Sequence, residues 1–500
     1  MSKPSFDIHK PVFFPAAILI LLTIGLSFFF SERIGAFFAD FQRWSSDSAG
    51  WFFVLAVNVF VGATLYFALS PYGRIRIGGE DATPEFSNFS WFSMLFAAGI
   101  GIGLLFYGVA EPIYHFANPP LPADTPAEKA HIAMLYTFLH WGFHSWGAYV
   151  MVGLALAYFT FNKELPLTFR SMFYPVLGER VKGWIGDLID IVAVLAALFG
   201  LATSFGVGVQ QIGAGLEHLA GIANSTSTHV LLILVITLMA TASVVLGLDK
   251  GVRVLSLWNM RIALFFLLAI FILGPTGFIL DTFVQSTGAY LDSFFQVGMW
   301  TEAYTETTWQ NDWTIFYWAW WISWSPFVGM FIARISKGRT IREFVLGSLI
   351  VPPILIFLWM CVFGGSALSM ELAGDTRISE AVNADLATSI FVFLEAFPLP
   401  TFTSILAMVL ITIFFVTSSD SGALVMDSIT SGGKLNPPVA QRIFWAFVQG
   451  GTAAALLFAG GLKALQSVVI STGLPFTMLI LLAVYSLYKA LRDEKEEGDS

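Results

Sequence analysis

The chain has 500 residues, of which 56% are apolar and 12% charged, and its formal net charge is −9 at pH 7. Soluble proteins average about 45–50% apolar and about 25% charged residues, so this composition excludes an ordinary soluble domain and indicates a polytopic membrane protein. The acidic excess lies in loops and in the C-terminal tail, and we therefore expect no nucleic-acid partner.

Segments long enough to span a bilayer, about 20 apolar residues each, recur along the whole chain. The first lacks a small-residue cleavage site behind it, so we interpret it as a membrane helix and not as a signal peptide. The fifth and seventh are long enough to tilt or kink. We predict twelve spans, at residues 11–31, 51–70, 89–112, 132–160, 184–216, 229–248, 254–284, 309–335, 343–367, 402–428, 439–460 and 466–490.

Basic residues orient these spans, because they collect on the cytoplasmic side. With the N-terminus inside, 20 of the 25 lysines and arginines lie in cytoplasmic segments. The five outside are Arg33, Arg43, Lys129, Arg377 and Lys463. We expect a multi-pass protein of the bacterial inner membrane, in contact with the lipid bilayer and with both termini cytoplasmic.

Two predicted spans carry helix-breaking residues. The third contains Gly99, Gly101 and Gly103, and the eighth contains Ser325-Pro326. Glycines let a backbone unwind and proline removes a helical hydrogen bond, although close packing through small residues is an alternative for the glycines. The two spans are five apart and cross in opposite directions, as interrupted helices do in the inverted halves of transporters.

This organisation divides the chain into a peripheral N-terminal part, two halves, a linker and a tail. The ranges are 1–86 (tail and helices 1–2), 87–284 (spans 3–7), 285–308 (extracytoplasmic linker), 309–491 (spans 8–12) and 492–500 (cytoplasmic acidic tail).

Aromatic residues indicate the substrate. Five tryptophans occur between Trp313 and Trp324 in span 8. In span 4, a continuous helix would place Trp141, Trp146 and Tyr149 within an arc of about 140°. Indole faces bind quaternary ammonium groups by cation–π interactions. We therefore predict one cavity between these residues and Trp320, Trp321 and Trp324. An aromatic packing core is the alternative, and an interfacial belt fits only Trp313 and Trp318.

Two histidines of span 4, His140 and His144, have the i, i+4 spacing of a metal-binding pair. They point away from the aromatic arc of span 4, and no carboxylate or cysteine partner is evident in the sequence. We therefore interpret them as hydrogen-bonding residues of the helix.

Span 10 contains five consecutive polar residues, Thr417 to Ser421, which are costly in a membrane unless they face protein, water or an ion. The hydroxyls of Thr417 and Ser418, with main-chain carbonyls freed near Ala97 and Ile100, have the oxygen chemistry of a sodium site. Back-bonding of these hydroxyls to their own helix is the alternative. The role of Asp420, as cap, ligand or proton relay, stays open.

The run Asp312 to Trp321 resembles the signature of the betaine/carnitine/choline transporters. The glycine run, the Trp-rich span 4 and the polar run of span 10 follow in the order that this family has, so the resemblance covers nearly the whole chain. It implies an all-α fold with a LeuT-like core of two inverted five-helix repeats, preceded by two extra helices. It also implies a homotrimer whose membrane-parallel interface helix comes from 285–308.

The resemblance also implies roles for single residues. The substrate box would be Trp141, Trp146, Tyr149 and Trp321, with Trp320, Trp324 and Phe327 along the permeation path and the glycines Gly99, Gly101 and Gly103 beside it. The sodium ligands would be the hydroxyls of Thr417 and Ser418 and the carbonyls of Ala97, Ile100 and Phe414. Choline-type relatives often have Asp in place of Gly103, so its absence favours a zwitterion. The lack of Lys and Arg in span 5 favours sodium symport.

We therefore predict sodium-coupled uptake of a quaternary ammonium or sulfonium zwitterion, such as glycine betaine, by alternating access. Proton-coupled or exchange transport of choline or carnitine is the alternative. A membrane enzyme would need an acid–base or metal cluster, for which only His140/His144 and Asp420 qualify, so we expect no enzymatic activity and no cofactor beyond Na⁺. The short tails argue against intrinsic osmosensing.

Overall fold

The computed structural model describes residues 6–99, 101–246, 253–305, 307–434 and 438–498. Within these ranges every regular element is a helix, and one isolated β-bridge joins Arg76 to Thr340. Among them, eight helices are long and apolar enough to cross a membrane. The chain is thus an all-helical polytopic membrane protein, as its composition predicts, while the count of twelve spans and the LeuT-like repeat stay predictions.

The first part of the chain contains the helices that precede the tryptophan-rich segment. They are α1 (Lys10–Phe29), α2 (Ser31–Leu69), η1 (Pro71–Arg74), α3 (Asn88–Gly99), α4 (Ile102–Ala117), α5 (Pro126–Trp141), α6 (Phe143–Phe161), η2 (Phe169–Phe173), α7 (Tyr174–Leu177), η3 (Gly178–Lys182), α8 (Trp184–Ala220), α9 (Thr226–Leu246), α10 (Arg253–Leu273), α11 (Thr276–Asp292) and α12 (Phe294–Gly298).

The second part begins with a π-helical turn that leads into the tryptophan-rich helix. Its elements are η5 (Asn311–Ile315), α13 (Phe316–Ile335), α14 (Ile341–Met360), the π-helical η6 (Cys361–Gly365), α15 (Ser366–Leu372), α16 (Arg377–Ala384), η7 (Leu386–Thr388), α17 (Ser389–Leu394), α18 (Pro400–Thr430) and α19 (Val439–Gly498). The last one joins two helices across a kink at Gly460 and Gly461, where the sequence predicts the end of span 11.

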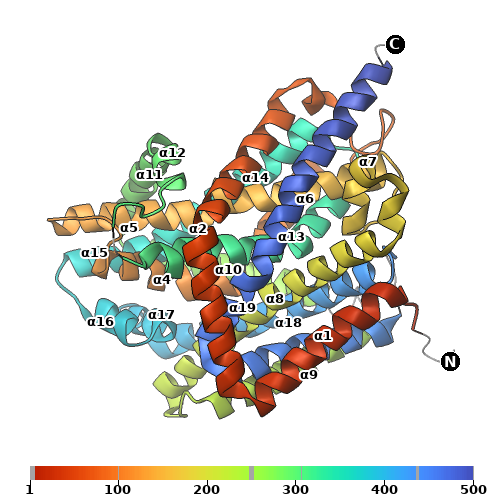
Figure 1. Ribbon diagram of the computed structural model, residues 1–500. Coiled ribbons are helices and arrows are strands. Elements are labelled where there is room, and N and C mark those ends of the chain that lie inside the picture. The colour runs from red at the N-terminus through yellow and green to blue at the C-terminus, as the bar shows by residue number, and fades with distance from the viewer. Residues whose placement is uncertain (1–5, 100, 247–252, 306, 435–437, 499–500) are drawn as a thin grey trace.

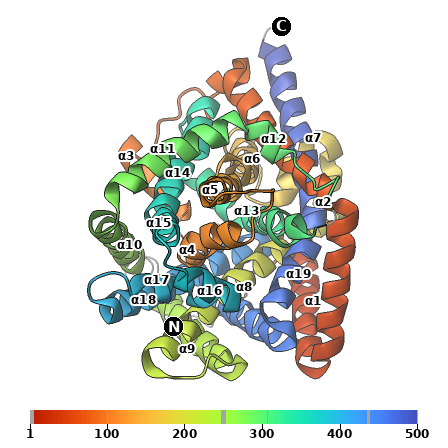
Figure 2. The same cartoon turned by 90° about the vertical axis from the view of Figure 1, so that its left-hand side faces the viewer.

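The helices form a buried centre and an apolar rim. Figure 2 shows α4, α5 and α13 near the middle of the molecule, with α1, α9 and α10 at its edges. Nearly every residue of α4, α6 and α13 is buried, whereas α9 and α10 expose large apolar side chains such as Leu231, Leu238 and Ile272. Exposed apolar surface on the rim is what contact with lipid tails requires. The buried central helices do not face lipid, so polar and aromatic side chains on them can form a binding site.

Contacts between loops and helix ends identify two opposite ends of the molecule. At one end, the backbone N–H of His9 donates to the Thr430 carbonyl, and Lys163 pairs with Glu494. At the other end, Asn118 contacts Asn383, and His218 pairs with Glu395. The first set joins segments predicted inside and the second set segments predicted outside. Figure 1 shows the start of α1 and the end of α19 on the same side, opposite α16 and α17.

The third span is interrupted, as its glycines predict. Helix α3 ends at Gly99 and α4 begins at Ile102, after Gly101 in an extended conformation (φ −153°, ψ −173°). The fourth span is interrupted as well, which we did not predict. Gly142 separates α5 from α6 (φ −94°, ψ −146°), and a Cβ there would lie 2.4 Å from the Phe138 carbonyl oxygen. Only glycine fits that close approach.

The predicted break at Ser325-Pro326 is wrong, because α13 continues through Pro326. Proline leaves the carbonyl four residues earlier without its usual N–H donor. In α13 this carbonyl belongs to Ile322, and the Ser325 hydroxyl donates to it at 2.6 Å. The side chain that we read as part of a break therefore replaces the missing hydrogen bond and keeps the helix intact.

Three other boundaries differ from the predicted ones. Helix α2 starts at Ser31, so the stretch expected as an external loop before span 2 is helical. Gly274 and Pro275 divide span 7 into α10 and α11. The helix expected within 285–308 therefore begins earlier, at Thr276, and ends at Asp292, followed by the short α12.

Replacing Ser325 with Ala should destabilise the protein by about 1–3 kcal/mol, because the Ile322 carbonyl would then be buried without a donor. Thermal unfolding in detergent measures this loss. In a Pro326→Ala background the helical N–H returns, and the same Ser325→Ala change should cost little. Equal costs in both backgrounds would contradict the role that we assign to this hydroxyl.

Candidate functional site

A cavity lies at the centre of the molecule, where the two interrupted spans meet α13. Trp141 at the end of α5, Trp146 and Tyr149 on α6, and Trp320, Trp321 and Trp324 on α13 line it together. The glycine run contributes Gly101 and Gly103, and α8 contributes Ser204. The structure thus brings the predicted aromatic residues into one cavity, although their role in binding a substrate stays a prediction. We refer to this cavity as the aromatic box.

Trp141 and Trp146 converge because of the interruption at Gly142, and not because they share one face of a continuous helix. The predicted arc assumed one continuous helix, whereas Trp141 ends α5 and Trp146 belongs to α6. The Gly142 carbonyl accepts from the Ser145 hydroxyl at 2.8 Å and from the Trp146 N–H at 3.3 Å. The broken backbone is therefore satisfied locally, and Trp141 and Trp146 reach the box from two separate helices.

The rings of the box pack against one another, in three perpendicular pairs and one stacked pair. Trp141 meets Trp321 with ring centroids 4.9 Å apart and planes at 71°, and Trp320 stacks on Trp321 at 5.0 Å and 12°. Tyr149 stands nearly perpendicular to Trp146 and to Trp321, at 5.4 Å and 6.2 Å. These ring–ring contacts fix the orientation of the aromatic walls, and the faces of such rings attract onium groups where they line a cavity.

Each indole of α13 in the box is anchored through its N–H group. Trp321 Nε1 donates to the His140 carbonyl at 2.8 Å. Trp320 and Trp324 both donate to the Gly200 carbonyl of α8, at 3.3 Å and 2.9 Å. A Cβ on Gly200 would lie 2.9 Å from Trp324 Cδ1, so glycine permits this approach. Because these N–H groups are bonded to main-chain carbonyls outside the cavity, the indoles present apolar ring surface to it.

The glycines of the run differ in how closely the box surrounds them. A Cβ on Gly103 would lie 3.0 Å from Trp141 Cη2 and 3.1 Å from Trp320 Cη2, whereas the nearest atom to one on Gly101 would be Trp324 Cη2 at 4.0 Å. Gly99 is the last residue of α3. Gly103 is therefore the position where even a methyl group would push the rings apart.

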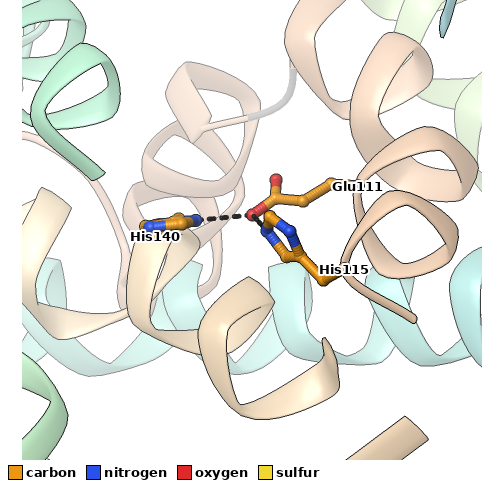
Figure 3. A group of neighbouring side chains, drawn as sticks. All are labelled: Glu111, His115 and His140. Atoms are coloured by element: carbon orange, nitrogen blue, oxygen red, sulfur yellow. Dashed lines mark hydrogen bonds and ion pairs between the residues drawn. The ribbon is translucent and has the colours of Figure 1, made fainter. Parts of the chain in front are cut away.

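A buried carboxylate lies behind the box, and we did not predict it. Glu111 of α4 accepts from Trp141 Nε1 at 2.7 Å and from the Tyr317 hydroxyl at 2.5 Å on one oxygen. Its other oxygen lies 2.6 Å from His140 Nδ1 and 3.3 Å from His115 Nε2. Figure 3 shows both imidazoles directed at this oxygen.

The expectation that His140 lacks a carboxylate partner is therefore wrong, because Glu111 comes from a different helix, 29 residues earlier in the chain. His144 instead bonds to the hydroxyl of Tyr290 through Nδ1 at 2.8 Å. A signal for Glu111 was present in the sequence. An ionisable residue inside an apolar span is a functional candidate by default, and His115 follows it at i+4.

Glu111, His115 and His140 also have the ligand types of a metal site, with ligand atoms within 4.8 Å of one another. The shortest separation in the group, 2.6 Å between Glu111 Oε1 and His140 Nδ1, is a hydrogen-bond distance. Ligands of one tetrahedral zinc ion lie farther apart, at about 3.3 Å for metal–ligand bonds of about 2.0 Å. We therefore describe the group as a hydrogen-bond network.

A second cavity lies between α10, α13 and α18. Thr417, Ser418 and Phe414 of α18 line it, opposite Phe327 and Trp324 of α13. Trp324 lines both this cavity and the aromatic box. Phe327 stands perpendicular to Trp324 at 5.5 Å and belongs to the second cavity. Phe327, which the resemblance places along a permeation path, thus lines the second cavity and not the aromatic box.

The predicted ion ligands are only partly described. The Thr417 hydroxyl donates to the carbonyls of Ile413 and Phe414, at 2.9 Å and 3.2 Å, which is the back-bonding considered as the alternative. Its oxygen lone pairs remain for a cation. Ile100 lies outside the described residues, as does the side chain of Ala97. Asp420 accepts from the Ser243 hydroxyl of α9 at 3.0 Å and is held away from both cavities.

Comparison with known proteins identifies the family. Residues 11–496 match the model of the BCCT, betaine/carnitine/choline family transporters. The chain is 44% identical to glycine betaine transporter 1 of Vibrio parahaemolyticus, over 99% of this chain and 96% of the relative. It is 44% identical to a glycine betaine/proline/choline transporter of the same bacterium, over 98% and 91%. It is 45% identical to the glycine betaine transporter OpuD of Bacillus subtilis, over 91% and 89%.

These relatives are named as transporters, and the match covers nearly the whole of this chain and of each relative. The chain is accordingly a transporter and not an enzyme. The aromatic box, the interrupted glycine-rich span and the apolar rim agree with that identification. The protein belongs to the betaine/carnitine/choline transporter family.

Proposed function

We propose that this protein takes up a quaternary ammonium or sulfonium zwitterion such as glycine betaine, together with sodium, by alternating access. The observation that carries the proposal is the aromatic box, in which indole and phenol rings from three helices surround one cavity. A trimethylammonium group among such faces gains about 0.5–2 kcal/mol per good contact once water is excluded. Relatives of this chain that transport glycine betaine, by their names, support the same substrate.

The arrangement of the two cavities supports alternating access. Trp324 lines both the aromatic box and the cavity beside Thr417 and Ser418. A substrate that leaves the box past Trp324 and Phe327 would enter the second cavity. Trp324 donates to Gly200 of α8, so a movement of α13 relative to α8 would open or close this passage.

Sodium coupling is proposed from the chemistry of the second cavity. Thr417 and Ser418 offer neutral hydroxyl oxygens, and Phe414 offers a carbonyl next to them. Hard cations prefer such ligands. Helix α18 packs against α4, which begins within the glycine run, between Gly101 and Gly103. The carbonyls of Ala97 and Ile100, which precede α4, would complete the site.

Orientation and assembly complete the proposal. Both termini would be cytoplasmic, which is supported by the contacts of the N-terminal segment and α19 with loops of the same end. The protein would act as a homotrimer in the bacterial inner membrane. Large apolar side chains on α11 and α12, including Val284 and Phe295, are exposed at 70% and 74% and would pack at a subunit interface.

Trp321→Ala should raise the apparent KM for glycine betaine at least about tenfold, because it removes the ring that contacts Trp141, Tyr149 and Trp320. Radiolabelled uptake into proteoliposomes measures this change. Trp318→Ala is the matched control, since Trp318 is a buried tryptophan of the same helix outside the lining of the box. It should lower the amount of folded protein and leave KM unchanged. An unaltered KM in Trp321→Ala would remove Trp321 from the site.

Gly103→Ala should weaken glycine betaine binding by about 1–3 kcal/mol, since overpacking forces neighbouring groups to move. The two indoles that its Cβ would approach are both walls of the box. Gly101→Ala is the paired control, because its Cβ has 4.0 Å of room and its extended backbone suits any residue. Equilibrium binding to the purified protein compares the two variants, and equal affinities would show that Gly103 does not shape the binding space.

Replacing both Thr417 and Ser418 with Ala should raise the sodium concentration for half-maximal uptake, because two ion-binding oxygens are lost. Thr412→Ala is the control, as Thr412 is a back-bonded threonine of the same helix and its hydroxyl donates to Met408. Uptake at increasing sodium, with potassium as the balancing ion, gives the comparison. If the unmutated protein transports equally well in potassium alone, sodium coupling is wrong.

A further inference from the structure

The fully buried Glu111 carboxylate receives four hydrogen bonds from side chains of three elements of the fold. Trp141 and His140 belong to α5, Tyr317 to α13 and His115 to α4 itself. An ionised carboxylate has about four acceptor positions, so it is completely satisfied when both imidazoles carry a proton on the nitrogen that faces it. A tryptophan N–H can only donate, which fixes the oxygen facing Trp141 as an acceptor. The hydrogen bonds around Glu111 therefore favour the ionised carboxylate, which carries one negative charge.

This negative charge has no strong cation beside it. Within the described part of the chain, the groups that pair with Glu111 are the two histidines, and no lysine or arginine is among them. His140 also contacts the Thr314 hydroxyl through Nε2 at 2.9 Å. Burying an unbalanced charge is costly in a protein interior, so a cation bound nearby would be stabilised by it.

The aromatic box is the nearby space that would hold this cation. Trp141 lies between Glu111 and the cavity, with its N–H bonded to the carboxylate and its ring against Trp321 at 4.9 Å. Tyr317, which also donates to Glu111, stacks on Trp321 at 5.8 Å and 30°. The carboxylate therefore bonds to the edge of one ring that lines the cavity, Trp141, and to the hydroxyl of Tyr317, which stacks on a second lining ring, Trp321.

On this geometry we propose that Glu111 is the counter-charge of the onium group and determines the preference for a charged head, without touching the substrate. It acts through two effects. Its negative charge attracts the cation across a medium of low dielectric constant. Its hydrogen bond to the N–H of Trp141 makes the face of this cavity-lining ring more negative toward a cation. The proposal rests on the proposed function of the box.

The role of Glu111 is thus that of a positioning residue, and its signature is a selectivity. A merely structural glutamate would support every ligand of the box equally. A counter-charge would raise the affinity for a trimethylammonium head and would not raise the affinity for an uncharged tert-butyl head of the same shape. Glycine betaine and 3,3-dimethylbutanoate are such a pair, because the second has carbon in place of the quaternary nitrogen and keeps the same carboxylate.

The test measures the affinity of the purified, full-length protein for both compounds, at constant sodium, by competition with radiolabelled glycine betaine. The unmutated protein should prefer glycine betaine. Glu111→Gln keeps the size and removes the charge, and it should reduce this preference about tenfold or more. Glu111→Asp keeps the charge and should retain most of the preference even where both affinities fall.

A matched pair of box variants tests the same proposal through the rings. Trp141→Phe removes an indole bonded to Glu111, and Trp146→Phe removes one that is not among the four donors. The loss of preference should be larger for Trp141→Phe. If Glu111→Gln does not yield folded protein, the comparison of these two variants tests the proposal on its own.

Two results would overturn the proposal. One is an equal loss of affinity for both compounds in Glu111→Gln, which would make the residue structural. The other is an equal loss of preference in the two phenylalanine variants. Failure of the proposed function has a different signature, since the unmutated protein would then bind neither glycine betaine nor another onium compound.

Discussion

The structure depends on the hydrogen bonds of four indoles that line the aromatic box, because the N–H group of a buried indole needs an acceptor. A buried N–H without a partner costs about 1–3 kcal/mol. Trp321 meets this requirement at the His140 carbonyl, Trp320 and Trp324 at the Gly200 carbonyl, and Trp141 at the Glu111 carboxylate. Four helices are thereby held at fixed distances around one cavity, by the same bonds that orient its walls.

Glycines make that arrangement possible. Gly142 interrupts the fourth span so that Trp141 and Trp146 reach the cavity from separate helices, and Gly200 lets α13 approach α8 closely enough for its two hydrogen bonds. The ring of Trp324, which donates to Gly200, lines both the box and the second cavity. In the proposed function, binding and passage of the substrate would therefore share one contact between α13 and α8.

Sequence reasoning was most successful where composition and residue type decide the outcome. The membrane class, the interruption at Gly101 and the convergence of Trp141 with Trp321 follow from apolar content, glycine spacing and the chemistry of indoles. It failed where a tertiary contact decides. Pro326 does not break α13 because the hydroxyl of the neighbouring Ser325 satisfies the freed carbonyl. The partner of His140 was missed because Glu111 approaches from another helix.

The central claim is that the aromatic box holds the onium group, and one measurement tests it most directly. Arsenobetaine has the shape of glycine betaine with arsenic in place of nitrogen, and arsenic scatters X-rays anomalously. A crystal structure of the protein with this compound should contain an anomalous peak inside the box, in contact with Trp141, Trp146 and Trp321. A peak in another part of the molecule, with the box free of it, would contradict the account.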